Sequence, residues 1–159
     1  MLHLIPAPLH RALYRIADRV RRCWWRLYKP TRHSVFVVAF EGGKALLVRH
    51  SYGPPVWTLP GGGRRLSEDP AAAMAREFRE ELQSPLSDMR LLASAVRTDC
   101  GSANHRHVFF AELAGTPRPD RREIMEARLC DPSELPANTT RWAAENVRLA
   151  VKARLGGAP

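Results

Sequence analysis

Three glutamates stand close together in one short segment of the sequence. Glu77, Glu80 and Glu81 have the spacing i, i+3, i+4, which on a helix places three carboxylates within one turn of each other. Like charges at this spacing destabilise a helix, and the last two also lie near its negative C-terminal end. A bound divalent cation would reconcile the cluster, because Mg²⁺ and Mn²⁺ prefer carboxylate oxygens. The alternative is a solvated acidic face steadied by an Arg76–Glu80 pair.

A run of three glycines precedes this segment. Gly61, Gly62 and Gly63 allow positive φ angles and a close approach of the backbone to a ligand. A glycine loop beside a metal-binding helix is suited to holding a phosphate chain.

The order of these residues resembles the signature of the Nudix hydrolases, which reads G-x5-E-x7-R-E-U-x-E-E-x-G-U. The lead-in Trp57-Thr58-Leu59-Pro60-Gly61-Gly62 is also similar to that of the family. Seven defined positions match at the required spacing: Gly62, Glu68, Arg76, Glu77, Phe78, Glu80 and Glu81. The strand order around the box extends the resemblance over roughly residues 34–155.

The sequence departs from the family pattern at two places. Gln83-Ser84 stand where the family has glycine and an apolar residue, and Arg65, next to Arg64, replaces a common acidic residue. A glycine at position 83 would take a left-handed conformation at the helix end, where glutamine costs about 1 kcal/mol. We expect either this strained conformation or a different helix end before Pro85.

The resemblance implies an α/β fold, a Nudix-like α/β/α sandwich with a mixed sheet. It also implies a pyrophosphohydrolase that cleaves a nucleoside diphosphate linked to another moiety by attack of water on phosphorus. Mg²⁺ or Mn²⁺ would promote this attack. The implied metal ligands are Glu77, Glu80, Glu81 and the Gly61 carbonyl.

The resemblance further implies a catalytic set made of Glu81, Glu80, Arg76 and Glu68. Arg76 would orient the glutamates, Glu68 would support the loop and helix, and Glu81 or Glu80 would act as general base. Our second choice for the base is Glu123 or Glu126. We expect the substrate to bind at Gly62, Gly63, Arg64 and Arg65, because arginines beside a phosphate site bind anions.

The segments around the box predict the elements that must position it. Apolar runs predict strands at Ser34–Phe40, Ala45–Val48, Met89–Val96, His107–Leu113 and Ile124–Leu129. A polar loop is expected over Asp99–His105. Ser67 or Asp69 is expected to cap a helix that runs to about Leu82, with an apolar side of Ala71, Ala75, Phe78 and Leu82. Asn138 or Thr139 is expected to cap a last helix, with Ala143, Val147, Ala150 and Val151 facing inward.

The N-terminal segment, 1–32, differs in charge from the rest of the chain. It holds eight basic residues and one acid, whereas the remainder holds 17 basic and 15 acidic residues. We therefore divide the chain into a basic amphipathic helical arm, 1–32, and a Nudix-like hydrolase domain, 33–159. The near-neutral domain argues against nucleic acid as a partner, and so against processing of RNA ends.

The arm has a helical stripe of apolar residues at Leu9, Leu13, Ile16, Val20, Cys23 and Leu27. We favour packing of residues 9–27 on the domain or in a homodimer, because apolar stripes usually mark protein contacts. The alternative is an anionic membrane surface, which basic helices with interfacial Trp bind.

The arginines of this segment follow the short apolar stretch Leu2–Leu9, whereas a signal peptide has its positive charges before the apolar run. We therefore expect a cytoplasmic protein, either free or peripheral at the membrane. A non-catalytic module that binds a nucleotide or a membrane is the competing hypothesis for the whole chain.

Overall fold

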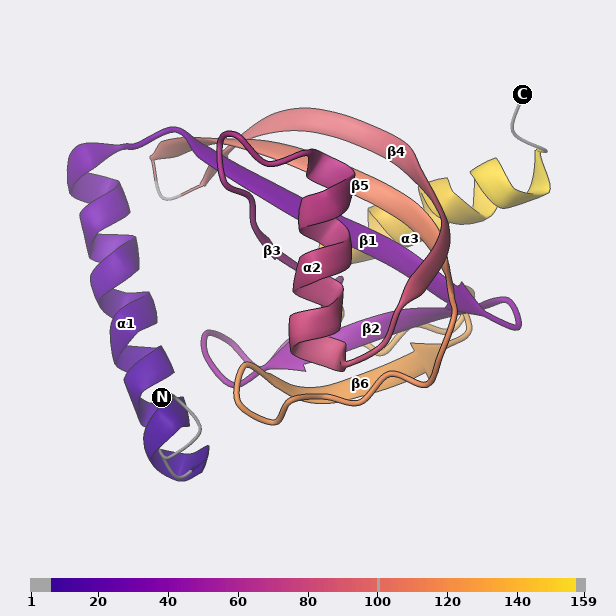
Figure 1. Ribbon diagram of the computed structural model, residues 1–159, viewed down its shortest axis with the longest axis horizontal. Coiled ribbons are helices and arrows are strands. Elements are labelled where there is room, and N and C mark those ends of the chain that lie inside the picture. Colours follow the sequence, from indigo (N-terminus) through magenta and orange to yellow (C-terminus); the bar gives the residue numbers. More distant parts are fainter. Residues whose placement is uncertain (1–6, 100, 157–159) are drawn as a thin grey trace.

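A computed structural model describes residues 7–99 and 101–156 of the chain (Figure 1). The side chains of residues 7–11 and of Arg22 lie outside the description, and with them the expectation for Leu9. The elements, in chain order, are α1 (Ala7–Tyr28), β1 (Arg32–Glu41), β2 (Lys44–His50), β3 (Gly61–Gly63), α2 (Pro70–Leu82), β4 (Leu86–Asp99), β5 (Ser102–Leu113), β6 (Ile124–Cys130) and α3 (Arg141–Leu155).

The strands form one mixed sheet in the order β4-β5-β1-β2-β6, and β3 pairs with β1. β1 is parallel to β5 and antiparallel to β2 and β3. β1 pairs with β2 only at Phe40 and Glu41, next to the two-residue turn Gly42-Gly43. The other end of the same edge, Ser34–Phe36, pairs with the three glycines of β3. The sheet itself therefore holds the glycine run in place.

Two helices cover the two faces of the sheet, α2 in front and α3 behind in Figure 1. Alternate residues of β1 point to opposite faces, so its Val-rich run is buried on both. One core joins β1 and β2 to Ala73, Met74, Phe78 and Leu82 of α2. The other joins them to Ala143, Val147 and Ala150 of α3, with Val151 packed against it. The α/β/α sandwich with a mixed sheet is confirmed.

The first helix of the sandwich begins where the sequence predicted, and its buried side matches the predicted one in part. Asp69 caps it by accepting the N–H groups of Ala71 and Ala72, both at 2.9 Å, and Pro70 follows at the first helical position. Met74, Phe78 and Glu81 lie on the buried side, whereas Ala75 is only partly buried. Phe78 and Leu82 are therefore buried as expected, while packing on β1 and β2 rotates the helix so that Met74 is covered in place of Ala75. One of the three glutamates is turned into the protein as a consequence.

The same helix ends in a left-handed residue that is not glycine. Gln83 has φ 52° and ψ 30°, and its N–H donates to the carbonyl of Arg79 at 3.0 Å. Of the two helix ends considered from the sequence, the strained one is observed.

Replacing Gln83 with glycine should stabilise the protein. Glycine takes the left-handed conformation without the Cβ clash, so we expect a gain of about 0.5–1 kcal/mol and a melting temperature about 1–4 °C higher. Thermal denaturation measures the shift. Gln83→Ala is the control, because alanine keeps the clash and should not stabilise. A Gln83→Gly protein that melts at or below the wild-type temperature would contradict this account.

Two local expectations are wrong. Asp99 and the residues from Ser102 onward do not form the expected loop, because β4 runs to Asp99 and β5 begins at Ser102. The polar side chains there pair across strands, since Asp99 accepts from Asn104 and from Arg106. The last helix is capped by Thr140, whose hydroxyl accepts the N–H of Ala143 at 3.3 Å, one residue beyond the expected caps.

The N-terminal helix contacts the domain through its polar side, not through its apolar stripe. Arg15 Nε donates to the carbonyl of Ser51 at 3.2 Å, and Ser102 Oγ donates to the carbonyl of Trp25 at 3.1 Å. The Tyr14 and Tyr52 rings stack with centroids 6.1 Å apart. The expectation that the apolar stripe packs on the domain is therefore wrong. None of the helices in the described part of the chain has the length and apolar composition needed to span a bilayer.

Candidate active site

Two glycines of β3 lie very close to their neighbours. A Cβ at Gly61, which has φ 153°, would overlap the carbonyl oxygen of Val35 on β1. A Cβ at Gly62 would overlap the carboxylate of Glu77 on α2. The glycines therefore bring the β3 backbone directly against the acidic side of α2.

Arg76 joins the loop, the glycine strand and the glutamates. Its guanidinium donates to Glu68 through Nε at 2.8 Å and Nη2 at 3.1 Å. Nη1 donates to Glu77 at 2.8 Å and to Glu80 at 3.2 Å, and Nη2 also contacts the Gly63 carbonyl at 3.3 Å. The paired hydrogen bonds from Arg76 lower the pKa of Glu68 to about 2. Arg76 thus contacts two of the three glutamates and Glu68 ties the loop to the helix, while the catalytic roles expected for both residues stay predictions.

Replacing Arg76 with alanine should weaken both the fold and the site. Glu68 and Glu77 would lose their shared partner, so we expect a melting temperature several degrees lower and turnover reduced at least about tenfold. Because the Glu68 pKa is lowered, the stabilisation from the Arg76–Glu68 pair is fully present above pH 4.5 and is lost as the pH falls toward 2. The stability difference between the two proteins should therefore shrink on acidification.

Arg79→Ala is the matched control, because Arg79 is exposed on the same helix and forms none of the ion pairs found among the described residues. Equal effects of the two substitutions would show that Arg76 acts only as a generic helix residue.

The three glutamates of α2 differ sharply in environment. The side chain of Glu80 is 62% exposed, that of Glu77 is 16% exposed, and Glu81 is 4% exposed. Burial raises the pKa of Glu81 well above its usual value, and the carboxylates of Glu123 and Glu77 raise it further. Burial also raises the pKa of Glu77, although Arg76 opposes this shift. Glu81 Oε2 is buried and has no hydrogen-bond partner among the described residues.

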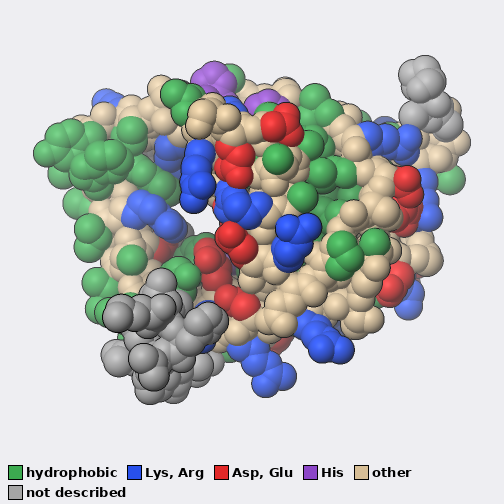
Figure 2. All heavy atoms as spheres, in the orientation of Figure 1, with side chains coloured by type: hydrophobic (Ala, Val, Ile, Leu, Met, Phe, Trp, Pro, Cys, Tyr) green, Lys and Arg blue, Asp and Glu red, His purple; other side chains and the backbone are tan. Residues whose placement is uncertain are grey.

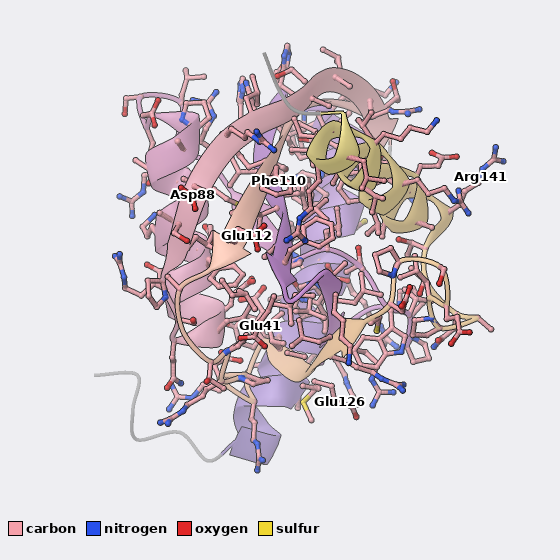
Figure 3. The ribbon with its side chains drawn as sticks, turned by 90° about the vertical axis from the view of Figure 1, so that its right-hand side faces the viewer. Glu41, Asp88, Phe110, Glu112, Glu126 and Arg141 are labelled. Carbon is pink, nitrogen blue, oxygen red and sulfur yellow. The ribbon has the colours of Figure 1, made fainter. Side chains whose placement is uncertain are left out.

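Of the two residues that were the second choice for the base, Glu123 lies beside the α2 glutamates and Glu126 does not. Glu126 is on the exposed side of β6, paired with Arg49, and Figure 3 labels it in a view from the end opposite α1. Glu123 lies in the turn before β6, where Asp120 Oδ1 accepts its N–H at 3.0 Å and Ser51 N–H donates to its carbonyl at 2.8 Å. Its carboxylate accepts the Tyr52 hydroxyl at 2.6 Å.

A cavity of about 800 Å³ opens beside β3. Its acidic lining is Glu77 and Glu123, and its basic lining is Arg21, Arg32 and Arg64. Figure 2 shows acidic and basic side chains meeting around a hollow between α1 and α2. The cavity is thus lined by both acidic and basic side chains.

The predicted substrate-binding residues separate in the structure. Gly61, Gly62, Gly63 and Arg64 line the cavity. The Arg64 guanidinium is held by the Glu68 carbonyl at 2.7 Å and by His33 Nδ1 at 3.1 Å. Arg65 is exposed and is not part of the lining, so the geometry gives no support to a role for it.

Several lining residues had not been predicted from the sequence. Arg21 and Trp25, which α1 contributes, are among them. The rings and guanidinium groups are stacked, with the Arg32 carbon Cζ 4.0 Å from the Trp25 ring centroid and that of Arg21 5.1 Å from it. No local pattern marks these residues, because their partners lie on β1 and in the loop after β2. The division of the chain into an arm, 1–32, and a domain, 33–159, stays a prediction. Independently of that division, α1 contributes residues to the cavity wall.

A family model described as the NUDIX domain matches residues 30–150 of the chain. The chain belongs to this family. As a Nudix hydrolase, the protein acts on phosphoanhydride bonds. The match spans β1 to most of α3 and leaves α1 outside.

Several solved structures share the fold of this Nudix hydrolase. A MutT NUDIX hydrolase from Burkholderia pseudomallei is 24% identical with a TM-score of 0.69, and the match covers 76% of this chain and 98% of that one. A UDP-X diphosphatase is 22% identical with a TM-score of 0.68, over 88% and 71% of the two chains. An Ap4A hydrolase from C. elegans is 20% identical with a TM-score of 0.65, over 79% and 98%. No curated protein matches this Nudix hydrolase.

Proposed function

We propose that this Nudix hydrolase is a divalent-metal-dependent pyrophosphohydrolase that splits a nucleoside diphosphate from another moiety by attack of water on phosphorus. The observation that carries the proposal is the cavity beside β3, whose lining combines the carboxylates of Glu77 and Glu123 with three arginines. Such a cavity can hold a polyanion at its arginines, which we call the basic wall, and cations at its carboxylates, which we call the acidic wall.

The acidic wall has the chemistry that a hard cation needs. Among the described residues, no three acidic, His or Cys side chains converge into a ready-made metal site. However, Glu81 keeps a buried oxygen without a hydrogen-bond partner, and the nearby Glu77 and Glu123 carboxylates repel it. A divalent cation among these oxygens would give the buried Glu81 oxygen a partner and would offset the repulsion between the carboxylates. The residues present therefore fit a divalent cation. We propose Glu77, Glu80, Glu81 and the Gly61 carbonyl as its ligands, with Mg²⁺ or Mn²⁺ as the ion.

When bound, the ion would supply Lewis-acid activation of a phosphoryl oxygen and of water. The chain's own residues supply the rest. Arg76 holds Glu77 and Glu80 in orientation through its Nη1 atom. Glu123 accepts the Tyr52 hydroxyl at Oε1, which leaves Oε2 to accept the proton of the attacking water. Glu81 and Glu80 remain the alternatives for this proton acceptor.

The basic wall is proposed to bind the diphosphate and its neighbouring groups. Arginine donates in a planar fork that matches phosphate oxygens, and Arg21, Arg32 and Arg64 all line the cavity. The two lining histidines, His33 and His50, do not add charge at neutral pH, because burial lowers the pKa of both, that of His50 to about 4. The arginines are therefore the positive groups of this wall.

A substrate panel with and without Mg²⁺ tests the function. Its members are a UDP-sugar, a dinucleoside tetraphosphate, ADP-ribose and nucleoside triphosphates, of which the first two follow the names of two structural neighbours. We expect hydrolysis of at least one member only when Mg²⁺ or Mn²⁺ is present, with product masses that place the cut at a phosphoanhydride bond. Nucleotide binding by calorimetry without turnover of any member would favour the non-catalytic module instead.

We also propose a cytoplasmic location, from the order of charges in the segment 1–32.

A further inference from the structure

The side of α1 that faces away from the domain carries a continuous row of exposed apolar side chains. We define this outer face by Leu13, Ile16, Val20, Cys23, Trp24, Leu27 and Tyr28. Leu13 is 47% exposed, and Ile16, Val20 and Leu27 are 59%, 64% and 72% exposed. Figure 2 shows the hydrophobic side chains over α1 along the edge of the molecule. A row of this length on one helix indicates a binding surface, because scattered apolar residues would not align.

The outer face cannot pack on the domain while α1 is docked as observed. The opposite side of the helix already holds Arg15 on the Ser51 carbonyl, Asp18 in a buried position next to Arg21, and Trp25 against Arg32. Turning the outer face inward would remove these contacts and dismantle one wall of the cavity. The partner of this face must therefore come from outside the domain.

The flank of the outer face is basic. Arg19 and Arg26 are exposed beside the apolar row, and neither forms any of the ion pairs found among the described residues. The segment 1–32 contains one acid, Asp18, and it is buried on the docked side. Trp24 and Tyr28 lie at the C-terminal end of the face with ring centroids 5.5 Å apart, and aromatic rings of this kind favour the membrane–water interface.

We propose that the outer face of α1 docks on an anionic lipid surface. The helix would lie in the plane of the interface with its apolar row among the acyl chains and its arginines among the head groups. The docked side of the same helix lines the cavity, so a protein bound in this way holds its cavity next to the lipid surface. The proposal does not depend on the hydrolytic activity.

A second copy of the chain fits the face less well. Two outer faces packed together would bring arginine rows of the same sign into contact, and the helix carries no exposed acid to neutralise them. Anionic lipid head groups supply the missing negative charge. The charge pattern therefore selects a lipid surface over a homodimer.

Vesicle sedimentation with the full-length protein tests the proposal. The vesicles contain phosphatidylcholine alone or phosphatidylcholine with phosphatidylglycerol. We expect binding to the anionic vesicles only, and we expect Ile16→Ser/Val20→Ser to weaken it roughly tenfold or more, because two large apolar side chains no longer insert. Arg19→Gln/Arg26→Gln should weaken it and reduce its dependence on salt.

The matched control is Leu91→Ser/Val96→Ser, which removes two apolar side chains of similar exposure, 56% and 59%, from β4. This variant should bind vesicles as the wild type does. Circular dichroism and turnover of Ile16→Ser/Val20→Ser in vesicle-free buffer check its fold, since neither residue lines the cavity. Truncation of α1 is avoided because it would also remove part of the cavity wall.

Three results would overturn the proposal. The first is a wild-type protein that sediments with no vesicle, and the second is an unchanged affinity of Ile16→Ser/Val20→Ser. The third is a wild-type dimer in sedimentation equilibrium that this variant converts to monomer without any change in vesicle binding, which would assign the face to a second copy.

Discussion

The Glu81→Gln protein should lose about 10³-fold in turnover while becoming more stable in the absence of metal. Glutamine has the same shape and no charge, so it cannot serve as an anionic ligand or accept a proton. The native carboxylate is 4% exposed and has one oxygen without a hydrogen-bond partner, beside the Glu77 and Glu123 carboxylates. Removing an uncompensated buried charge stabilises a fold, and we expect a gain of about 1 kcal/mol or more in the presence of EDTA.

Turnover at saturating Mg²⁺ and thermal denaturation in EDTA and in Mg²⁺ measure these effects. Any rise in melting temperature that Mg²⁺ causes in the wild type should be absent or much smaller in Glu81→Gln. Glu145→Gln is the control, because Glu145 is exposed on α3 and pairs only with Arg141 among the described residues. A Glu81→Gln protein that turns over within about threefold of the wild type would remove Glu81 from the catalytic machinery.

The Glu123→Gln protein should lose about 10²-fold in turnover with little change in KM. If Glu123 accepts the proton of the attacking water, the substitution removes an interaction of the transition state and leaves substrate binding intact. The turn that carries Glu123 is held by Asp120 and Ser51, so the substitution should not displace its backbone. The dependence of activity on the Mg²⁺ concentration should stay the same, which separates this role from that of a metal ligand.

Steady-state kinetics of Glu123→Gln and Glu126→Gln provide the test. Glu126 has the same side chain in the adjoining strand, but it pairs with Arg49 on the exposed side of β6. We expect Glu126→Gln to behave as the wild type. Full activity of Glu123→Gln would return the role of base to Glu81 or Glu80.

The vesicle-binding test of α1 and the Arg76→Ala test of the active site are independent of each other, because the outer face of α1 shares no residue with the α2 glutamates. Either prediction can therefore hold while the other fails.

The helix that carries the glutamates could be predicted from the sequence because its signals are local. Asp69 is one of the two caps expected for its start, Pro85 requires the helix to end before it, and the helical repeat alone places three carboxylates within one turn. The strands could be predicted for a similar reason, since β1 is buried on both faces and reads as a continuous apolar run.

Long-range packing decided what each glutamate experiences. From the sequence, Glu77, Glu80 and Glu81 were equivalent candidates for metal ligands. In the structure, the rotation of α2 on β1 and β2 buries Glu81 and exposes Glu80. The same kind of contact separates Glu123 from Glu126, because the hydroxyl of Tyr52 holds the first and Arg49 holds the second.

The orientation of α1 shows the limit of a sequence pattern most clearly. The periodicity of its apolar residues identified the helix but not the face that meets the domain. Tyr14, Arg15 and Trp25 find their partners in the loop after β2 and at the start of β5, far away in the chain, and these contacts turn the apolar face outward. An amphipathic pattern shows that a helix has two unlike faces, and only the surface available on the folded domain determines which of them is covered.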